Sequence, residues 1–426
     1  MNQNPFFAEL GYSFETCSLG VLINKLNKMI RKYCLMAAFS VAFTGIGLLH
    51  AQDDLIKKIS GNSSDSTGFR FTDIINLAVT PIENQGSSGT CWSYSANSFL
   101  ESEMIKAGRK PVPLAKIYTA RRSYEDKAAN YVKMNGAVSW GDGGEPHDVI
   151  NMYAKYGAVP ETAYTGLLNG ATTNNFSEMQ AILKSILDAV IKNPAGVLSP
   201  RWKKAFAATL DAYLGPVPPM FTYENKSYTP QSFAKEVVGL DPDNYIEFIS
   251  QNNTPYWQKA MMMVPDNWAF QWDYNIPQTA LTDIIDHALK NGYTVAWGTD
   301  VSEPYFSWPN GVAFVPQTPA SYVKTVTAAQ KKELFSGPKP EPEITAALRQ
   351  TGIENGQTSD DHGMHIVGLS KDQQGKEYYI IKNSWGTGNE YKGYLHVTKA
   401  YVQFKTTSIL VNKKAVPQSV ASKIRL

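Results

Sequence analysis

The sequence predicts an α+β fold in which a mainly helical first part is followed by a β-rich second part. Apolar residues recur at helical spacing after position 91 and again within 166–290, in MQAILKSILDAVIKN and RWKKAFAATLDAYLG. From 292 onward the pattern changes. GYTVAWGTDVS (292–302) is typical of a buried strand, and apolar residues alternate along DDHGMHIVGLS (360–370). These segments place helices and strands in different parts of the chain.

Composition describes an ordinary globular protein. The 426 residues include 40 Lys and Arg against 38 Asp and Glu, a formal net charge of +2, and 43% are hydrophobic. This balance provides no basic surface for nucleic acid, so we expect no nucleic-acid partner. The length suggests two or three structural units, or one large domain with insertions.

Residues 1–52 are expected to be an export segment outside the fold. A basic stretch ending at Lys32 precedes CLMAAFSVAFTGIGLL (34–49), an apolar run of the length of a signal-peptide core. The run is short for a membrane span, which favours cleavage near Ala51 over a retained anchor. Met29 is an alternative start. We therefore expect a periplasmic or secreted protein without a stable membrane span after cleavage.

Cysteine usage singles out one residue. Of the three cysteines, Cys17 and Cys34 lie in the segment expected to be removed, so the mature chain keeps Cys91 alone. No disulfide can then form within one chain, although the expected compartment is oxidising. Cys91 is either a buried small apolar residue or a reactive thiol. Its surroundings favour the second interpretation.

Cys91 follows a glycine- and serine-rich loop, NQGSSGTCWSYS (84–95). Gly86 and Gly89 indicate a tight turn, and the apolar spacing after it predicts a helix that begins at or near Cys91. The N–H groups and dipole at a helix N-terminus favour the thiolate, which is the nucleophilic form. Gln85 could donate a side-chain N–H, with the Cys91 backbone N–H, to a carbonyl oxygen attacked by that thiolate.

A cysteine nucleophile needs a proton partner, and His362 is the candidate. Its strand leads through a Gln-Gly turn into YYIIKNSWG, so the hairpin brings Asn383 back toward His362. The Asn383 side-chain oxygen would then fix the imidazole tautomer, and Trp385 would shield that bond from water. A zinc pair made by His362 and His365 is the alternative. Residues at i and i+3 of a strand point to opposite faces, so we expect no metal.

The other histidines are expected to be structural or only peripheral to the site. His365 and His287 fit core positions, and His396 is expected on a strand surface. His147 follows Gly143 and Gly144 and would either touch a substrate or pack.

Four segments resemble the papain-like cysteine peptidases: QGSSGTCW (85–92), GGEPHDVINMYAKYGAVPE (143–161), DHGMHIVG (361–368) and NSWGTGNEYKGYL (383–395). Within that family the chain resembles the bleomycin hydrolase/aminopeptidase C branch over roughly 70–420. The resemblance implies a papain-like fold, with a helical left half, a β-rich right half and an active-site cleft between them. It also implies catalytic roles for Cys91, His362, Asn383 and Gln85 and substrate contacts for Gly143, Gly144 and Trp385.

The resemblance further implies hydrolysis of peptide bonds through an acyl-enzyme, without a cofactor. Members of this branch act as aminopeptidases, because a C-terminal arm places its carboxylate in the cleft. The resemblance therefore favours an aminopeptidase, although the chain ends at SKIRL, only a short way past VNKKAVP, which leaves open whether the tail reaches the cleft. A papain-like endopeptidase with an open cleft is therefore the alternative, followed by an inactive peptide-binding homologue. Assembly into a homo-oligomer is implied by family analogy.

The expected organisation has five parts and an exposed connector at 330–350. The five parts are an export segment (1–52), a linker with an N-terminal strand (53–78), a helical half with the nucleophile (79–165), a large helical insertion (166–290) and a β-rich half with His362 and Asn383 (291–426).

Overall fold

A computed structural model describes residues 68–317 and 327–426. The expected export segment, and nearly all of the linker, lie outside these residues. The described residues all belong to the second of the two units into which the chain divides, residues 51–426. Among them, no helix combines the length and the apolar character needed to cross a bilayer.

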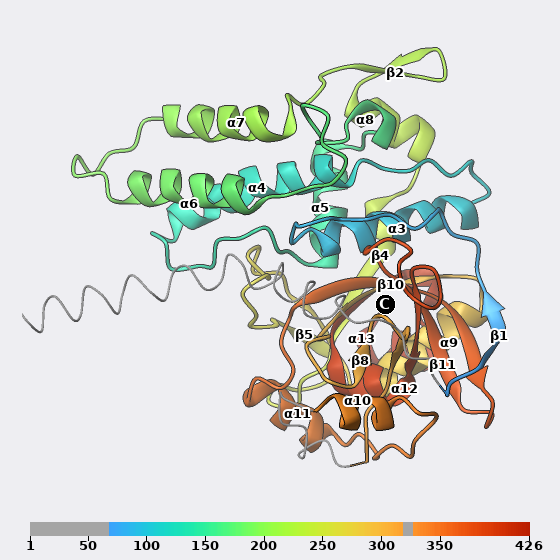
Figure 1. Cartoon of the computed structure of the whole chain (residues 1–426). Helices are drawn as coiled ribbons and strands as arrows, with labels where there is room; N and C mark the ends of the chain where they lie inside the picture. The colour runs from blue at the N-terminus through green and yellow to red at the C-terminus, as the bar shows by residue number, and fades with distance from the viewer. Residues whose placement is uncertain (1–67, 318–326) are drawn as a thin grey trace, which may run out of the picture. The chain divides into compact units, whose positions relative to one another are not determined.

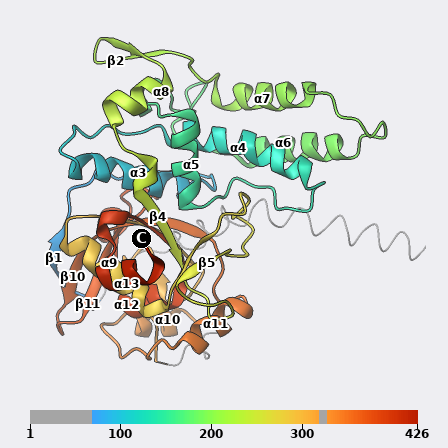
Figure 2. The same cartoon turned by 180° about the vertical axis from the view of Figure 1, so that it is seen from behind.

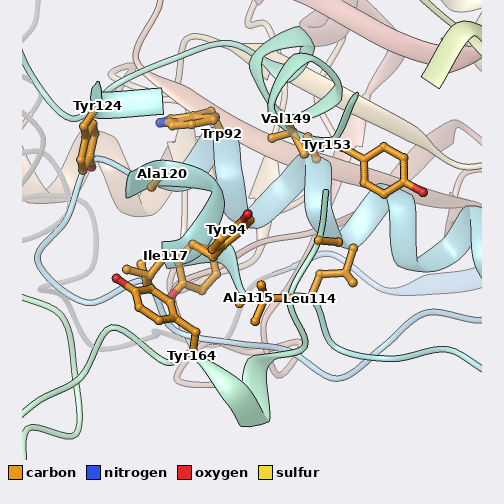
Figure 3. Close-up of a cluster of buried hydrophobic side chains, with 14 of the residues drawn as sticks. Trp92, Tyr94, Leu114, Ala115, Ile117, Ala120, Tyr124, Val149, Tyr153 and Tyr164 are labelled. Carbon is orange, nitrogen blue, oxygen red and sulfur yellow. The ribbon is translucent and has the colours of Figure 1, made fainter. Parts of the chain in front are cut away.

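The helical part is built around a core that includes Trp92, Phe99 and Leu183. Figure 1 shows its helices gathered on one side of this unit. Figure 3 shows part of the core, which includes Trp92, Val149 and several tyrosines such as Tyr124. The helices are α3 (Cys91–Lys106), α4 (Lys116–Lys133), α5 (Pro146–Tyr156), α6 (Ser177–Ile191), α7 (Arg201–Leu214) and the short α8 (Pro230–Phe233).

One large mixed sheet forms the other part. Its strand order is β5-β6-β4-β13-β7-β10-β11-β12-β9-β8, and β1 pairs with β10. The strands are β1 (Phe71–Asn76), β4 (Tyr245–Ile249), β5 (Gln258–Ala260), β6 (Asp273–Asn275), β7 (Val295–Thr299), β8 (Phe306–Ser307), β9 (Val312–Ala313), β10 (His362–Asp372), β11 (Glu377–Lys382), β12 (Tyr394–Thr398) and β13 (Thr406–Asn412). A separate hairpin joins β2 (Phe221–Tyr223) and β3 (Lys226–Tyr228).

A second core, including Trp297, Ile366 and Ile381, lies between the sheet and the remaining helices. Figure 2 shows α9 and α13 beside the sheet. These helices are α9 (Gln278–Lys290), α10 (Ala328–Leu334), α11 (Ala346–Glu354), α12 (Lys399–Lys405) and α13 (Gln418–Ile424). The predicted strand at 292–302 appears as β7, and its central place between β13 and β10 explains its continuous apolar run.

Two expectations need correction. The region 166–290 contains the predicted helices α6 and α7, but it also contributes β4, β5 and β6 to the large sheet. Two of these strands have only three residues, too few to show a period. The region 330–350 is not an exposed connector throughout: α10 and α11 enter it from both sides, and Phe335 and Ile344 are buried.

Candidate active site

Cys91 is the first residue of α3, as the glycine-rich approach predicted. It is buried, with 5% of its surface exposed, and makes no disulfide bond in the described part of the chain. The preceding loop is tight at Gly86, whose φ is +62°, and a Cβ there would lie 2.6 Å from the Asn174 carbonyl oxygen. Glycine is therefore required at this turn, which brings the chain into the helix at Cys91.

Gln85 is fully buried, and its side chain is fixed at both ends. The Ser384 hydroxyl donates to Gln85 Oε1 at 2.6 Å, and Gln85 Nε2 donates to the Ser88 carbonyl at 2.6 Å. The Gln85 backbone N–H also donates to the Ser384 carbonyl at 2.8 Å. An amide nitrogen carries two protons, so Nε2 keeps a second N–H for another acceptor. Ser384 lies inside the NSWG segment, but its role was not predicted.

His362 and Asn383 lie at the start of β10 and just after β11, and the hairpin joins them as predicted. His362 Nε2 is 2.8 Å from Asn383 Oδ1, which also accepts the Ser384 backbone N–H at 2.7 Å. That backbone donor identifies the Asn383 atom as the oxygen, so His362 Nε2 must carry the proton. His362 Nδ1 is then the basic nitrogen in the neutral ring. Burial lowers the pKa of His362 to about 4, and the Asn383 bond opposes the shift.

The start of β10 lies against the first turn of α3. A Cβ on Gly363 would be 3.0 Å from Trp92 Cα and 3.1 Å from Trp92 N. Only a glycine fits at that distance without displacing backbone. His362 directly precedes Gly363 in the chain, and Cys91 directly precedes Trp92. The close packing therefore brings the two candidate catalytic residues to the same boundary between α3 and the sheet.

Trp385 covers this site. Its ring centroid lies 4.5 Å from that of His362, and the two planes are inclined by 36°. The Trp385 ring also contacts Trp308 and Phe306, which hold it in place. This position fits the predicted shielding of the His362 hydrogen bond. Substrate contact by Trp385 stays a prediction.

The glycine pair lies beside the nucleophile loop. Trp92 Nε1 donates to the Asp142 carbonyl at 2.9 Å, and the Asp142 carboxylate accepts the Gly89 backbone N–H. A Cβ on Gly144 would lie 2.9 Å from the Trp92 ring, and one on Gly143 would lie 2.0 Å from the Asp266 carboxylate. Crowding by the rigid Trp92 ring therefore favours glycine at Gly144, whereas Asp266 could move away from a side chain at Gly143. Substrate binding by either glycine stays a prediction.

The remaining histidines are all packed. His365 is fully buried and lies 3.0 Å from the Ser98 hydroxyl, and His287 Nδ1 is 2.8 Å from a backbone carbonyl. The expectation for His396 was wrong: it is buried, stacked on the Phe71 ring at 3.8 Å between centroids. The strand β1 covers it, which the local pattern around His396 does not reveal.

Buried charged side chains from α3, α4 and β11 form a network near the candidate site. Lys116 donates to Glu101 at 2.7 Å and pairs with Glu83 at 2.8 Å, and Lys382 donates to Ser98 at 2.8 Å. Burial lowers the pKa of Lys382 to about 8, against the opposing charges of Glu101 and Glu83. Lys382 lies far from the other members of this network in the chain, and no sequence signal links it to them.

Comparison with known proteins agrees with this arrangement. The family model described as papain family cysteine protease matches residues 343–413, which include His362 and Asn383. Cysteine proteinase 1, mitochondrial, of Saccharomyces cerevisiae (strain JAY291) is 23% identical, with 95% of this chain and 89% of the yeast protein covered. Aminopeptidase C of Lactobacillus delbrueckii subsp. lactis is also 23% identical, with 88% and 89% covered.

A solved structure extends the likeness to the whole fold. PepW from Lactobacillus rhamnosis HN001 superposes with a TM-score of 0.65, covering 92% of this chain and 94% of that one at 20% identity. The match over residues 343–413 and these relatives make the chain similar to the papain-family cysteine peptidases. The helical half and the β-rich half predicted from the sequence are both present, and the start of α3 meets the start of β10 between them.

Proposed function

We propose that this chain hydrolyses peptide bonds with Cys91 as nucleophile and His362 as general base. The main support is the 2.8 Å bond between His362 Nε2 and Asn383 Oδ1. Because that bond holds the Nε2 proton, Nδ1 is available to accept a proton from a thiol. The packing of Gly363 on Trp92 supports the assignment of Cys91 as that thiol.

In the proposed reaction, the Cys91 proton moves to His362 Nδ1 and the thiolate attacks the peptide carbonyl. The developing oxyanion accepts the second Gln85 Nε2–H and the Cys91 backbone N–H. His362 then protonates the leaving amine, and a thioester to Cys91 remains. Water, deprotonated by His362, hydrolyses this acyl-enzyme and restores the thiol. Asn383 keeps the imidazole in one tautomer through both stages.

We further propose that the activity is that of an aminopeptidase. The support is the naming of relatives that cover most of this chain, aminopeptidase C and aminopeptidase W of Lactobacillus delbrueckii subsp. lactis. An aminopeptidase requires a group that recognises the free α-amine of its substrate. An open cleft without such a group would instead give an endopeptidase.

The test uses residues 52–426 in reducing buffer and matched peptide amides, one set with free N-termini and one acetylated. Cleavage read by mass should release residues one or two at a time from the free-amine set only. Equal cleavage of the acetylated set would contradict the aminopeptidase proposal but not the cysteine chemistry. The matched control is Cys91→Ala, and its retention of full activity would refute the nucleophile assignment.

The export of the chain, with cleavage near Ala51, also stays a proposal. N-terminal sequencing of the protein recovered from the periplasm or medium should begin near residue 52. Recovery only from the cytoplasm, with residues 1–52 attached, would contradict it. The homo-oligomer implied by family analogy is tested by light scattering during size-exclusion chromatography, where a monomer mass would exclude it.

A further inference from the structure

A cavity of about 340 Å³ lies apart from the candidate catalytic residues, lined by residues of α5, β4, β6 and β13. None of Cys91, His362 and Asn383 is among its lining residues. Its wall includes three ionisable residues from three different elements: His147 on α5, Glu247 on β4 and Asp273 on β6. Each has only 5% of its surface exposed.

These three residues are close enough to share one ligand. Each can offer one nitrogen or oxygen atom such that all three atoms lie within 4.8 Å of one another. His147 Nδ1 is 2.8 Å from Glu247 Oε2. Among the described residues, His147 Nε2 and Glu247 Oε1 are buried and have no hydrogen-bond partner. Buried polar atoms in native proteins are nearly always paired, so Glu247 Oε1 needs a further partner, whereas His147 Nε2 has the Asp148 carboxylate 3.8 Å away.

The charge of the cluster indicates what that partner is. Glu247 and Asp273 both face His147, and Asp148 Oδ1 lies 3.8 Å from His147 Nε2. Carboxylates therefore outnumber the single imidazole in a buried site, which is costly without a compensating cation. Lys259 and Lys413 line the same cavity, but both are exposed.

We propose that His147, Glu247 and Asp273 bind one divalent transition-metal ion, of the zinc or manganese type. An imidazole nitrogen with two carboxylate oxygens suits such ions, whereas an all-oxygen set would favour magnesium or calcium. Three protein ligands leave a coordination position open, and the adjoining cavity provides room for a water molecule there. The ion would connect β4 and β6 to α5, the helix that begins shortly after Gly143 and Gly144. It would therefore link the helical part to the sheet.

The test uses the full-length chain carrying Cys91→Ala, so that metal cannot bind the candidate nucleophile. After removal of metal by a chelator, Zn²⁺ and Mn²⁺ are titrated by calorimetry, and melting is followed with and without each ion. The Asp273→Asn variant removes one ligand with little change in shape. We call the Cys91→Ala chain the parent. We expect the parent to bind one more ion than the Asp273→Asn variant does, and to melt at a higher temperature when the ion is bound. The Asp273→Asn variant should show no such rise in melting temperature with the ion, and it should melt no lower than the metal-free parent.

Glu103→Gln is the matched control, because Glu103 is a buried carboxylate outside the cavity that accepts a bond from Asn412. This variant should keep the ion and the melting shift. Equal binding by the parent and Asp273→Asn, or no binding of either ion by the parent at millimolar concentration, would overturn the proposal. An ion lost equally by Glu103→Gln would do so as well.

Discussion

Gly363 rests on the backbone of Trp92, with space for no side chain between them: a Cβ at Gly363 would lie 3.0 Å from Trp92 Cα. This contact joins two segments far apart in the sequence at the positions next to Cys91 and His362. The distance between nucleophile and base is therefore set by packing of β10 on α3, in addition to the conformations of the two side chains.

Gly363→Ala should separate these elements. The added methyl meets backbone that cannot move away alone, so we expect a loss of about 1–3 kcal/mol in the free energy of unfolding. The loss in kcat should be larger than the loss of folded protein explains, because a small displacement of the reacting groups has a large effect on the reaction rate. Urea unfolding and peptide-amide turnover measure the two effects. Gly388→Ala is the control, since a Cβ there meets nothing within 4 Å. A Gly363→Ala variant as active and stable as this control would contradict the packing argument.

Asn383→Ala should lower kcat with little change in KM. The imidazole loses the acceptor that holds the Nε2 proton, so part of the population adopts the wrong tautomer. We expect a loss of about 10- to 100-fold, below the roughly 10²–10⁴ that a general base itself supplies. Steady-state kinetics on a free-amine peptide amide measure it. A loss of less than threefold would show that Asn383 does not orient His362.

Gln85→Ala should reduce kcat by about 10²–10³, the effect of removing one oxyanion donor. Ser384→Ala tests how that donor is held, because Ser384 donates to Gln85 Oε1. It should lower kcat by a smaller factor, since the donor remains but is less fixed. Thermal melting of both variants confirms that they fold. A change below tenfold in Gln85→Ala, with folding intact, would refute its assigned role.

Stability should fall with acid because His362 is buried in its neutral form. Its pKa of about 4 in the folded chain lies below the ordinary value of 6.5. Between these values the unfolded chain binds a proton that the folded chain excludes, so unfolding becomes easier as the pH falls from 6.5 toward 4. The effect on the free energy of unfolding should approach about 3 kcal/mol at the acid end.

The histidine contribution can be isolated with His362→Gln. Urea unfolding at pH 7.5 and pH 4.5 should show a smaller loss of stability in this variant than in the unchanged chain. Other buried histidines contribute as well, since burial lowers the pKa of His396 to about 3. An equal loss in both proteins would show that His362 does not titrate in this way.

Much of the site follows from local sequence patterns. The glycines before Cys91 predict a turn, the apolar spacing after it predicts α3, and the strand pair around Gly375 predicts the approach of Asn383 to His362. These features depend on neighbours in the chain, or on a hairpin whose turn the sequence reveals.

Features that depend on distant partners could not be predicted. The three-residue strands β5 and β6 join the sheet only because β4 is already there, and their own sequences show no period. The burial of His396 depends on Phe71 in β1. The pairing of Lys116 with Glu101 and the meeting of His147 with Asp273 require the folded chain.

The most direct test of the proposed catalytic pair is the pH dependence of Cys91 alkylation. In residues 52–426 Cys91 is the only cysteine, so intact mass after brief exposure to iodoacetamide reports on it alone. We expect faster modification near pH 7 in the unchanged chain than in His362→Ala, because the neutral His362 Nδ1 can accept the Cys91 proton. In His362→Ala the same rate should be reached only near the ordinary thiol pKa of about 8.5. Identical profiles in the two proteins would contradict the transfer of the Cys91 proton to His362.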